Sequence, residues 1–227
     1  MSAKISIVIP TLNAEDHLPQ CLSALIEGLP AGLIREVIIS DGGSDDATRR
    51  IAEATGAEVM TGPASRGGQL RRGVDAVRAP WVMVLHADTV LDPGWADVVA
   101  RHLDHPDPAA AYFQLAFRAT GMMPALVAGW ANLRARLFGL PYGDQGLLLR
   151  MVDYRQAGGF PDQPLMEDVA LVRALKVPLV GLPVRAVTSP ARYQRDGWLR
   201  RGARNLWTLL RYLAGADPAR LAKVYRR

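Results

Sequence analysis

The chain has 227 residues, of which 49% are hydrophobic and 22% are charged. This length and mixture predict one large α/β domain with a sizeable core, and leave too little chain for two comfortable domains. No run of about 18 apolar residues occurs, so we expect no membrane-spanning helix. Residues 1–4 lack the pattern of a secretory signal. The single cysteine, Cys21, excludes an internal disulfide and fits a reducing cytoplasm.

Charge is distributed unevenly along the chain. Residues 1–184 carry a net charge of −4 and residues 185–227 a net charge of +9, which together give +5. An acidic body with a basic tail predicts that the tail meets something anionic. Phosphate ligands and an anionic membrane surface both qualify, whereas nucleic acid is not an expected partner.

The first 90 residues predict four strands that alternate with helices. We expect strands at 5–9, 36–40, 57–60 and 81–86, and helices at 14–27, 46–55 and 69–78. This alternation predicts right-handed βαβ units and a parallel sheet. The last of these strands is an unbroken apolar run, which is typical of a central strand buried on both faces.

The second half is less regular. We expect helices at 93–105, 123–138, 167–176 and 198–213, and strands at 110–118, 146–150 and 184–188. The helix at 198–213 is amphipathic, with leucines on one face and arginines elsewhere. Two interpretations stay open for it. It could pack its Leu/Trp face on the body, which we favour, or lie on an anionic membrane, which suits a lipid-linked acceptor.

Polar residues follow the predicted strands of the first half. The carboxyl ends of parallel strands meet at one edge of the sheet, so one crevice would hold them all. A nucleotide there needs acceptors for its base and ribose, and cations for its phosphates. The candidate nucleotide-sugar-binding residues are Pro10, Thr11, Asn13, Glu15, Asp41, Gly42, Arg66, Arg71, Ala87 and Asp88.

Several of these residues also have a purely structural interpretation. Asp41 with Ser44 could serve only as a turn and cap, and a lone arginine is usually solvated. His86 could bind a metal or a phosphate, but packing at the strand end is the favoured interpretation. No Gly-x-Gly-x-x-Gly follows the first strand and no P-loop motif exists, which disfavours a Rossmann dinucleotide fold and excludes a P-loop.

Glu167 and Asp168 are the candidate catalytic residues. They begin a predicted helix, where capping alone would explain one carboxylate. A sugar hydroxyl that attacks an anomeric carbon needs a positioned base, and Asp168 has the right chemistry for it. The loop that contains Gly143, Asp144 and Gln145 reads from its spacing as a simple turn.

The ordered combination of segments 7–13, 40–48, 85–89 and 167–168 resembles the family 2 glycosyltransferases. Segments 143–146, 189–193 and 213–225 are similar to a bacterial subgroup, the selenodomain-associated transferase 2 proteins. The resemblance implies an α/β, GT-A-like nucleotide-diphospho-sugar transferase fold with a mostly parallel central sheet flanked by helices. It further implies a transferase domain at 1–190, with a nucleotide-binding half near 1–90 and an acceptor half near 91–190. A basic helical tail at 191–227 packs on this domain or extends from it.

The resemblance also implies a mechanism and a set of ligands. An acceptor hydroxyl, deprotonated by Asp168, attacks the sugar of a nucleoside-diphosphate-sugar donor with inversion. Asp88 holds a divalent cation, Mg²⁺ or Mn²⁺, and Gly143, Asp144 and Gln145 face the acceptor or donor sugar. The chain departs from the family in having His86-Ala87-Asp88 where Asp-x-Asp is usual. A His86 ligand would favour Mn²⁺; alternatively, arginines take over part of the metal's role.

Two other functions stay open. A degenerate transferase fold that binds a nucleotide without turnover would fit the missing first aspartate. A sugar-phosphate nucleotidylyltransferase would need a glycine-rich loop with Arg or Lys after the first strand, which segment 10–13 does not provide. For each of these functions, the glycosyltransferase included, we expect a cytoplasmic protein, with peripheral contact at the inner face of the membrane as an open alternative.

Overall fold

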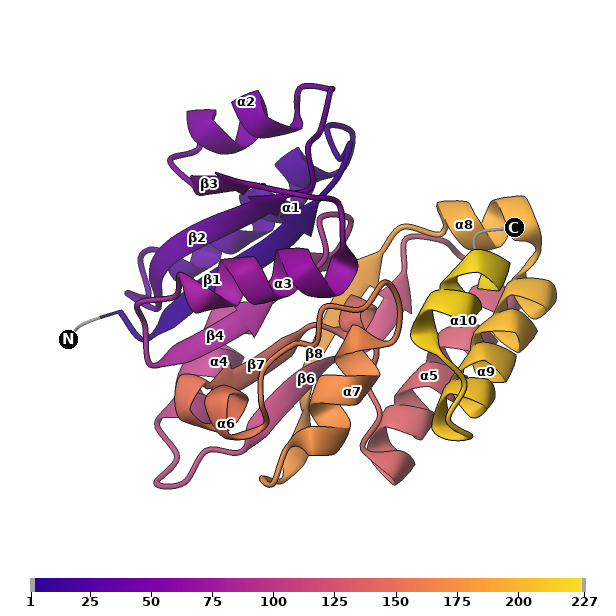
Figure 1. Ribbon diagram of the computed structural model, residues 1–227. Helices are drawn as coiled ribbons and strands as arrows, with labels where there is room; N and C mark the ends of the chain where they lie inside the picture. The colour runs from indigo at the N-terminus through magenta and orange to yellow at the C-terminus, as the bar shows by residue number, and fades with distance from the viewer. Residues whose placement is uncertain (1–2, 226–227) are drawn as a thin grey trace.

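A computed structural model of the chain describes residues 3–225 (Figure 1). Residues 1–2 and 226–227 lie outside the described part. The first two belong to the segment predicted to lack a secretory signal, and the last two belong to the predicted tail. The strands are β1 (Ile5–Thr11), β2 (Ile34–Asp41), β3 (Glu58–Thr61), β4 (Trp81–Val84), β5 (Val90–Leu91), β6 (Ala110–Phe117), β7 (Leu147–Arg150) and β8 (Leu179–Thr188). The helices are α1 (Leu18–Leu25), α2 (Thr48–Ala54), α3 (Arg66–Asp75), α4 (Trp95–Leu103), α5 (Met122–Phe138), α6 (Met151–Gln156), α7 (Glu167–Ala174), α8 (Ala191–Asp196), α9 (Trp198–Leu213) and α10 (Pro218–Tyr225), with 3₁₀ turns η1 (Ile26–Gly28) and η2 (Gly143–Gln145).

The strands form one eight-stranded sheet in the order β3-β2-β1-β4-β7-β6-β8-β5. The first four strands in sequence pair in parallel, which confirms the parallel arrangement predicted for the first half. β7 then runs antiparallel to β4 and β6, while β8 returns parallel to β6. The carboxyl ends of β1, β2 and β4 therefore share one edge, next to the start of β7.

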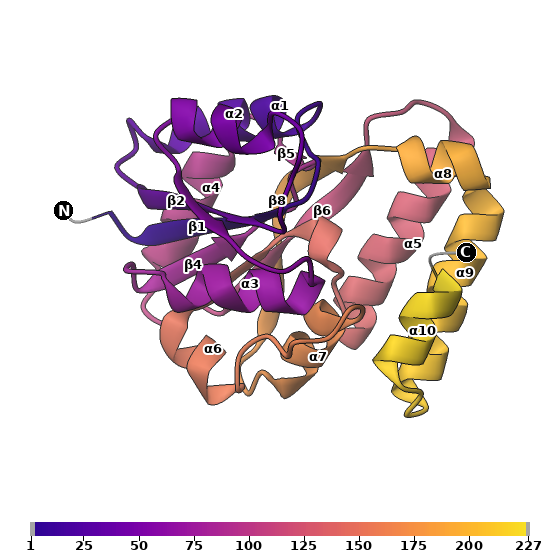
Figure 2. The same cartoon turned by 45° about the horizontal axis from the view of Figure 1, so that its top comes forward.

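Helices cover both faces of the sheet (Figure 2). Alternate residues of β1 point to opposite faces: Ile7 and Ile9 pack with α1 and α4, and Val8 packs with α3, α6 and α7. All three side chains are fully buried. The apolar run predicted to be buried on both faces forms β4, and all of the residues of β4 are buried.

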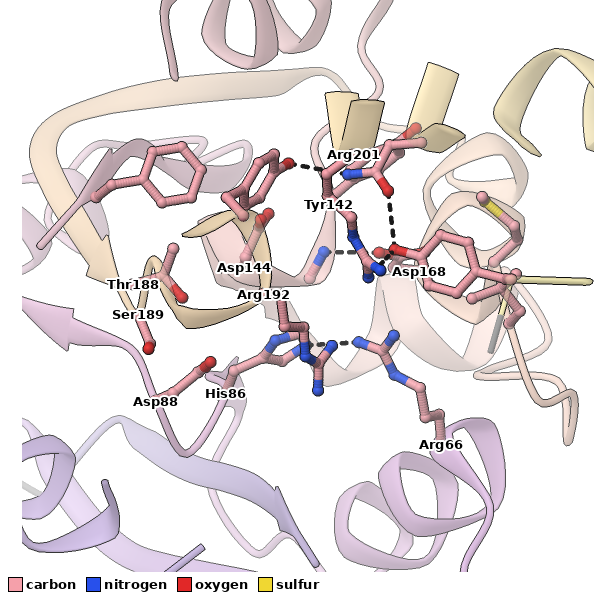
Figure 3. Close-up of a pocket in the computed structure, with 17 residues that line it drawn as sticks. Arg66, His86, Asp88, Tyr142, Asp144, Asp168, Thr188, Ser189, Arg192 and Arg201 are labelled. Carbon is pink, nitrogen blue, oxygen red and sulfur yellow. Dashed lines mark hydrogen bonds between the residues drawn. The ribbon is translucent and has the colours of Figure 1, made fainter. Parts of the chain in front are cut away.

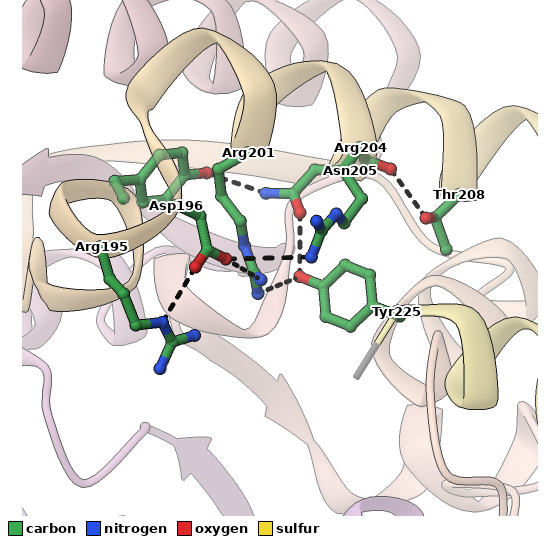
Figure 4. Close-up of polar contacts among 8 residues, drawn as sticks. Arg195, Asp196, Arg201, Arg204, Asn205, Thr208 and Tyr225 are labelled. Atoms are coloured by element: carbon green, nitrogen blue, oxygen red, sulfur yellow. Dashed lines mark hydrogen bonds and ion pairs between the residues drawn. The ribbon is translucent and has the colours of Figure 1, made fainter. Parts of the chain in front are cut away.

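A further layer of helices stands at one end of the sheet, where α9 lies beside α5 and α10 beside α9 (Figures 1 and 2). The bounds predicted for α9 are correct, but the orientation favoured for it is wrong. Leu199 is 74% exposed and Trp207 63%, whereas Arg201 and Thr208 are buried. The helix faces inward with its polar side because partners for those polar groups lie there: Arg201 donates to Asp196 and to the hydroxyl of Tyr225 (Figure 4).

The elements that the sequence did not predict are short: β5, α6, α8, α10 and η2. Each is two to eight residues long, too short for hydrophobic periodicity to identify. Within residues 3–225, no helix has both the length and the apolar character needed to cross a bilayer.

Candidate functional site

A pocket lies between the carboxyl end of β4, the start of α7 and the C-terminal helices (Figure 3). It brings together six of the residues predicted from the sequence. These are Arg66, His86, Asp88, Gly143, Asp144 and Asp168. Residues from both halves of the chain therefore meet in one place, with Asp88 following β4 and Asp168 in the first turn of α7.

Asp88 stands two residues beyond His86 in the turn after β4, where the N–H of Thr89 donates to the carbonyl of His86 at 3.1 Å. Its side chain lines the pocket and makes no hydrogen bond or ion pair with any residue of 3–225. Mg²⁺ is commonly held by one or two carboxylates together with substrate phosphates. Asp88 fits that kind of site. No cluster of three or more His, Cys, Asp and Glu side chains within residues 3–225 would hold a metal by itself.

His86, the second predicted metal ligand, faces a cation. Its Nε2 lies 3.3 Å from a guanidinium nitrogen of Arg66. Burial and this neighbouring charge lower the pKa of His86 to about 4, so the ring is neutral and its Nε2 can accept a hydrogen bond from Arg66. Arg66 would have to move before the same nitrogen could bind a metal. The packed, hydrogen-bonded interpretation of His86 fits this geometry.

Arg66 is the first residue of α3, which begins earlier in the chain than the helix predicted at 69–78. The next residue, Gly67, packs so closely on the loop after Phe160 that a Cβ there would collide with the backbone of Pro161. This approach places the Nε of Arg66 3.3 Å from Glu167. Glu167 is 1% exposed, and burial raises its pKa to about 7 although the charge of Arg66 opposes the shift. Glu167 therefore contacts Arg66, which lines the pocket, but does not line the pocket itself.

Asp168 is held by two backbone N–H groups. Its Oδ2 accepts from Gly143 at 2.6 Å and its Oδ1 from Val169 at 2.7 Å. The residue before α7, Met166, has the left-handed backbone angle φ 64°, which is uncommon for a non-glycine residue. A side chain at Gly143 would come within 2.6 Å of His86 Nε2, so glycine lets η2, α7 and the end of β4 converge.

The other two residues of the predicted sugar-facing turn have different positions. Asp144 lines the pocket, and burial raises its pKa to about 6. One of its carboxylate oxygens is buried without a hydrogen-bond partner among the described residues. Gln145 is fully buried and does not line the pocket. Its amide donates to the carbonyl of Phe113 and accepts from the N–H of Tyr142, so it fixes the turn.

The predicted nucleotide-binding residues at the ends of β1 and β2 form a hydrogen-bonded edge beside the pocket. Asp41 is buried and accepts from the hydroxyls of Thr11 and Ser44 and from the N–H groups of Gly43 and Ser44. Burial raises the pKa of Asp41, but these hydrogen bonds outweigh it and hold the pKa below its ordinary value. Both carboxylate oxygens are thus engaged in the turn, and a direct contact with a base stays a prediction.

The remaining residues of this group are spread along the same edge, with one exception. Asn13 and Glu15 accept from the backbone N–H groups of Asp45 and Ala47 and so join the two strand ends. Arg71 lies on the outer side of α3, where it is exposed and 3.9 Å from Asp75. It lines a different hollow. Pro10, Gly42 and Ala87 lie along β1, after β2 and after β4.

The sequence prediction missed the contribution of the C-terminal helices. Arg192 and Tyr193 of α8, Arg201 and Asn205 of α9, and Tyr225 of α10 all line the pocket. The tail is therefore part of the site rather than an appendage to it. The available signal was the net charge of +9 in residues 185–227.

The family model for glycosyl transferase family 2 matches residues 6–123, more than half of the chain. The chain belongs to glycosyl transferase family 2. The match runs from β1 through β6 to the start of α5, and so includes Asp41 and Asp88. It ends before Asp168.

Similar proteins agree with this assignment. Uncharacterized glycosyltransferases of Mycobacterium tuberculosis and Mycobacterium bovis are 34% identical over 101 residues, which cover 44% of this chain and 44% of theirs. The match thus spans less than half the length of these curated relatives. The subgroup resemblance stays a prediction.

Solved structures confirm the GT-A-like fold. The mannosyltransferase PcManGT from Pyrobaculum calidifontis, in complex with GDP-Man and Mn²⁺, has a TM-score of 0.69 at 14% identity and covers 99% of this chain and 68% of its own. S. aureus TarS 1-349 in complex with UDP gives 0.62 at 14%, covering 98% and 69%. Glucosyl-3-phosphoglycerate synthase from Mycobacterium tuberculosis, in complex with Mn²⁺, UDP and phosphoglyceric acid, gives 0.57 at 22%, covering 90% and 77%.

Proposed function

We propose that the protein is an inverting glycosyltransferase that moves a sugar from a nucleoside-diphosphate-sugar donor to an acceptor hydroxyl, with Asp168 as general base. The observation that carries this proposal is that Asp88 and Asp168 line one pocket together with three arginines, Arg66, Arg192 and Arg201 (Figure 3). A carboxylate at the start of a helix, held by two N–H groups, has a fixed position from which to take a proton.

The charged groups of the pocket suit a diphosphate. Arg66 and Arg192 project into it, and guanidinium groups bind phosphate oxygens through charge-assisted hydrogen bonds. Asp88 is the residue that would hold a divalent cation, Mg²⁺ or Mn²⁺, whose charge would stabilise the diphosphate as it leaves. The complexes of PcManGT with GDP-Man and Mn²⁺ and of TarS with UDP support a donor and cation of this class.

Asp144 and Gly143 are the residues that we place nearest the sugar, because they line the pocket beside Asp168. Glu167 acts in this proposal as a positioning residue that orients Arg66. Asp41, Thr11 and their neighbours shape the edge of the sheet against which the nucleoside would lie. An acceptor hydroxyl carried on a lipid would suit the same pocket if the protein sat on a membrane.

A transfer assay with Asp168→Asn tests the base directly. Radiolabelled donor is incubated with the wild type and each of two acceptor pools, a lipid extract and a soluble extract. Loss of a general base should lower transfer by about 10²–10⁴-fold while donor binding stays within a few-fold. Asp75→Asn is the matched control, because Asp75 is an exposed carboxylate on α3 outside the pocket. Transfer by Asp168→Asn at the wild-type rate would remove Asp168 from this role.

A further inference from the structure

The two neighbouring helices α5 and α9 expose a concentration of apolar side chains. Among residues 3–225, 17 large hydrophobic residues are exposed, and 11 of them belong to these two helices. On α5 they include Met122 at 75% and Leu137 at 62% exposure, and on α9 Leu199 at 74% and Trp207 at 63%. The helices stand side by side at the end of the molecule (Figures 1 and 2). So many exposed apolar residues in one region mark an interaction surface.

The orientation of α9 follows from its polar side, which is satisfied inside the protein. Arg201 donates to Asp196 and Tyr225, and the Tyr225 hydroxyl in turn donates to Asn205 (Figure 4). Turning the leucine face inward would leave this buried network without partners, at a cost for each orphaned polar group. The apolar stripe of α9 is therefore held outward by the fold.

Arginines border one side of the apolar stripe of α9. At 100° per residue, Arg200 and Arg211 fall beside Trp207 on the exposed side of the helix. Both arginines are exposed, and neither forms an ion pair with a residue of 3–225. Residues 185–227 as a whole carry a net charge of +9. An apolar stripe with tryptophan, bordered by arginines, has the composition of a helix that lies in the interface of an anionic bilayer.

We propose that α5 and α9 form a docking surface for a membrane that contains anionic phospholipids. Charge complementarity selects this occupant, because a second copy of the chain would bring the same basic region against itself. The apolar stripe would enter the boundary between headgroups and acyl chains, and the arginines would meet lipid phosphates. Here α9 serves two surfaces, since its polar side lines the pocket and its apolar side contacts lipid.

This arrangement has a consequence for the acceptor, which rests on the proposed function. A helix with its side chains is about 10–12 Å across, so the pocket would lie about one helix diameter from the lipid. An acceptor hydroxyl on a lipid headgroup would be within reach at that height. The docking itself does not depend on sugar transfer, and it can be tested alone.

Flotation of the full chain with vesicles tests the docking. We expect the wild type to float with phosphatidylcholine vesicles that contain about 30% phosphatidylglycerol, and to remain unbound with phosphatidylcholine alone. Trp207→Ser with Leu210→Ser should lower the partition coefficient by about tenfold or more. The matched control is Ile26→Ser with Leu29→Ser, at residues 59% and 58% exposed on η1 and just after it, which should float like the wild type.

The basic flank has its own variant and control. Arg200→Gln with Arg211→Gln should lower binding to anionic vesicles by about 30-fold, at about fivefold per charge. Arg49→Gln with Arg50→Gln, two exposed arginines of α2, should leave it unchanged. Circular dichroism and donor binding of each variant show whether the fold and the pocket are intact, so failure of docking is separable from failure of the transferase proposal.

Three results would overturn the docking proposal. The first is a wild type that does not float with anionic vesicles at low salt. The second is a folded Trp207→Ser, Leu210→Ser variant that floats as well as the wild type. The third is a dimer, seen by light scattering, that this variant abolishes, because it would assign the surface to a second copy of the chain.

Discussion

Single carboxyl groups in and beside the pocket hold protons more tightly than they would in water. Burial raises the pKa of Asp144 to about 6 and that of Glu167 to about 7, and in both cases the charge of Asp168 adds to the effect. Arg66 opposes the shift at both groups. A divalent cation bound beside these carboxyl groups would lower their pKa values and favour their ionised forms.

The raised pKa of Glu167 predicts a pH dependence of stability. The folded state holds the proton of Glu167 up to about pH 7, whereas the unfolded chain releases it near the ordinary glutamate pKa of 4.5. The folded state therefore binds more protons between these values, and the free energy of unfolding should fall as pH rises from about 4.5 to about 7, by a few kcal/mol at most.

Glu167→Gln should remove this slope. Melting temperatures of the wild type and the variant, measured across this pH range, should converge or cross as pH rises, because only the wild type loses stability from this group. Parallel curves over the whole range would show that Glu167 stays ionised in the folded protein and pairs fully with Arg66.

At the scale of elements, the site depends on close packing between the start of α3 and the loop that leads to α7. Gly67 allows this approach, since a Cβ would meet the backbone of Pro161 and the backbone nitrogen of Gln163 at 2.8 Å. The backbone N–H of Gly67 also donates to the carbonyl of Gln163 at 3.2 Å. The position of Arg66 therefore follows from the residue beside it.

Gly67→Ala should destabilise the protein by about 1–3 kcal/mol or more, because neither backbone can move away without loss of packing. Gly129→Ala is the matched control. A Cβ at Gly129, an exposed position inside α5, meets nothing within 4 Å, so this variant should gain up to about 1 kcal/mol from helix propensity. Thermal denaturation measures both. A Gly67→Ala variant as stable as Gly129→Ala would contradict the tight approach.

Elements with a strong local pattern could be predicted from the sequence. The unbroken apolar runs gave β1, β2 and β4, and the polar residues after β4 gave the position of Asp88 in the pocket. The orientation of α9 could not be predicted, because an amphipathic pattern defines two faces without showing which one meets the protein. That choice depends on tertiary partners of Arg201 in α8 and α10, which are too short to show a periodicity of their own.

The roles of individual residues at the strand ends also could not be predicted from the sequence. Asp41 ends β2 and Asp88 lies in the turn beyond β4, both at the carboxyl edge of parallel strands, yet the first is enclosed by hydrogen bonds from its own turn and the second is free of them among the described residues. Spacing alone cannot distinguish a carboxylate that builds a turn from one that faces a pocket. The difference arises from Thr11 and Ser44, which supply the hydroxyl donors to Asp41.

The whole molecule joins a parallel half, whose strands end at one edge of the sheet, to a second half whose terminal helices line the pocket. The family 2 match ends at residue 123, whereas Asp168 and the α8–α10 residues come from beyond it. The charge asymmetry acts at this scale as well, since the basic C-terminal segment stands against an otherwise acidic body. A diphosphate placed between them would contact arginines of both parts, Arg66 and Arg192.

The central claim is that the pocket binds a nucleoside-diphosphate sugar together with a divalent cation on Asp88. Calorimetric titration with UDP-, GDP-, CDP- and dTDP-sugars, with and without Mn²⁺, tests this claim most directly. We expect that one donor class binds, that Mn²⁺ tightens its binding, and that Asp88→Asn abolishes the Mn²⁺-dependent gain while Asp75→Asn retains it. Mutation of a residue that only supports a metal ligand typically lowers metal affinity by about 10–100-fold. Asp88 would bind the metal directly, so Asp88→Asn should lower the Mn²⁺ affinity by at least about tenfold. No binding by any donor, or wild-type Mn²⁺-dependent binding by Asp88→Asn, would contradict it.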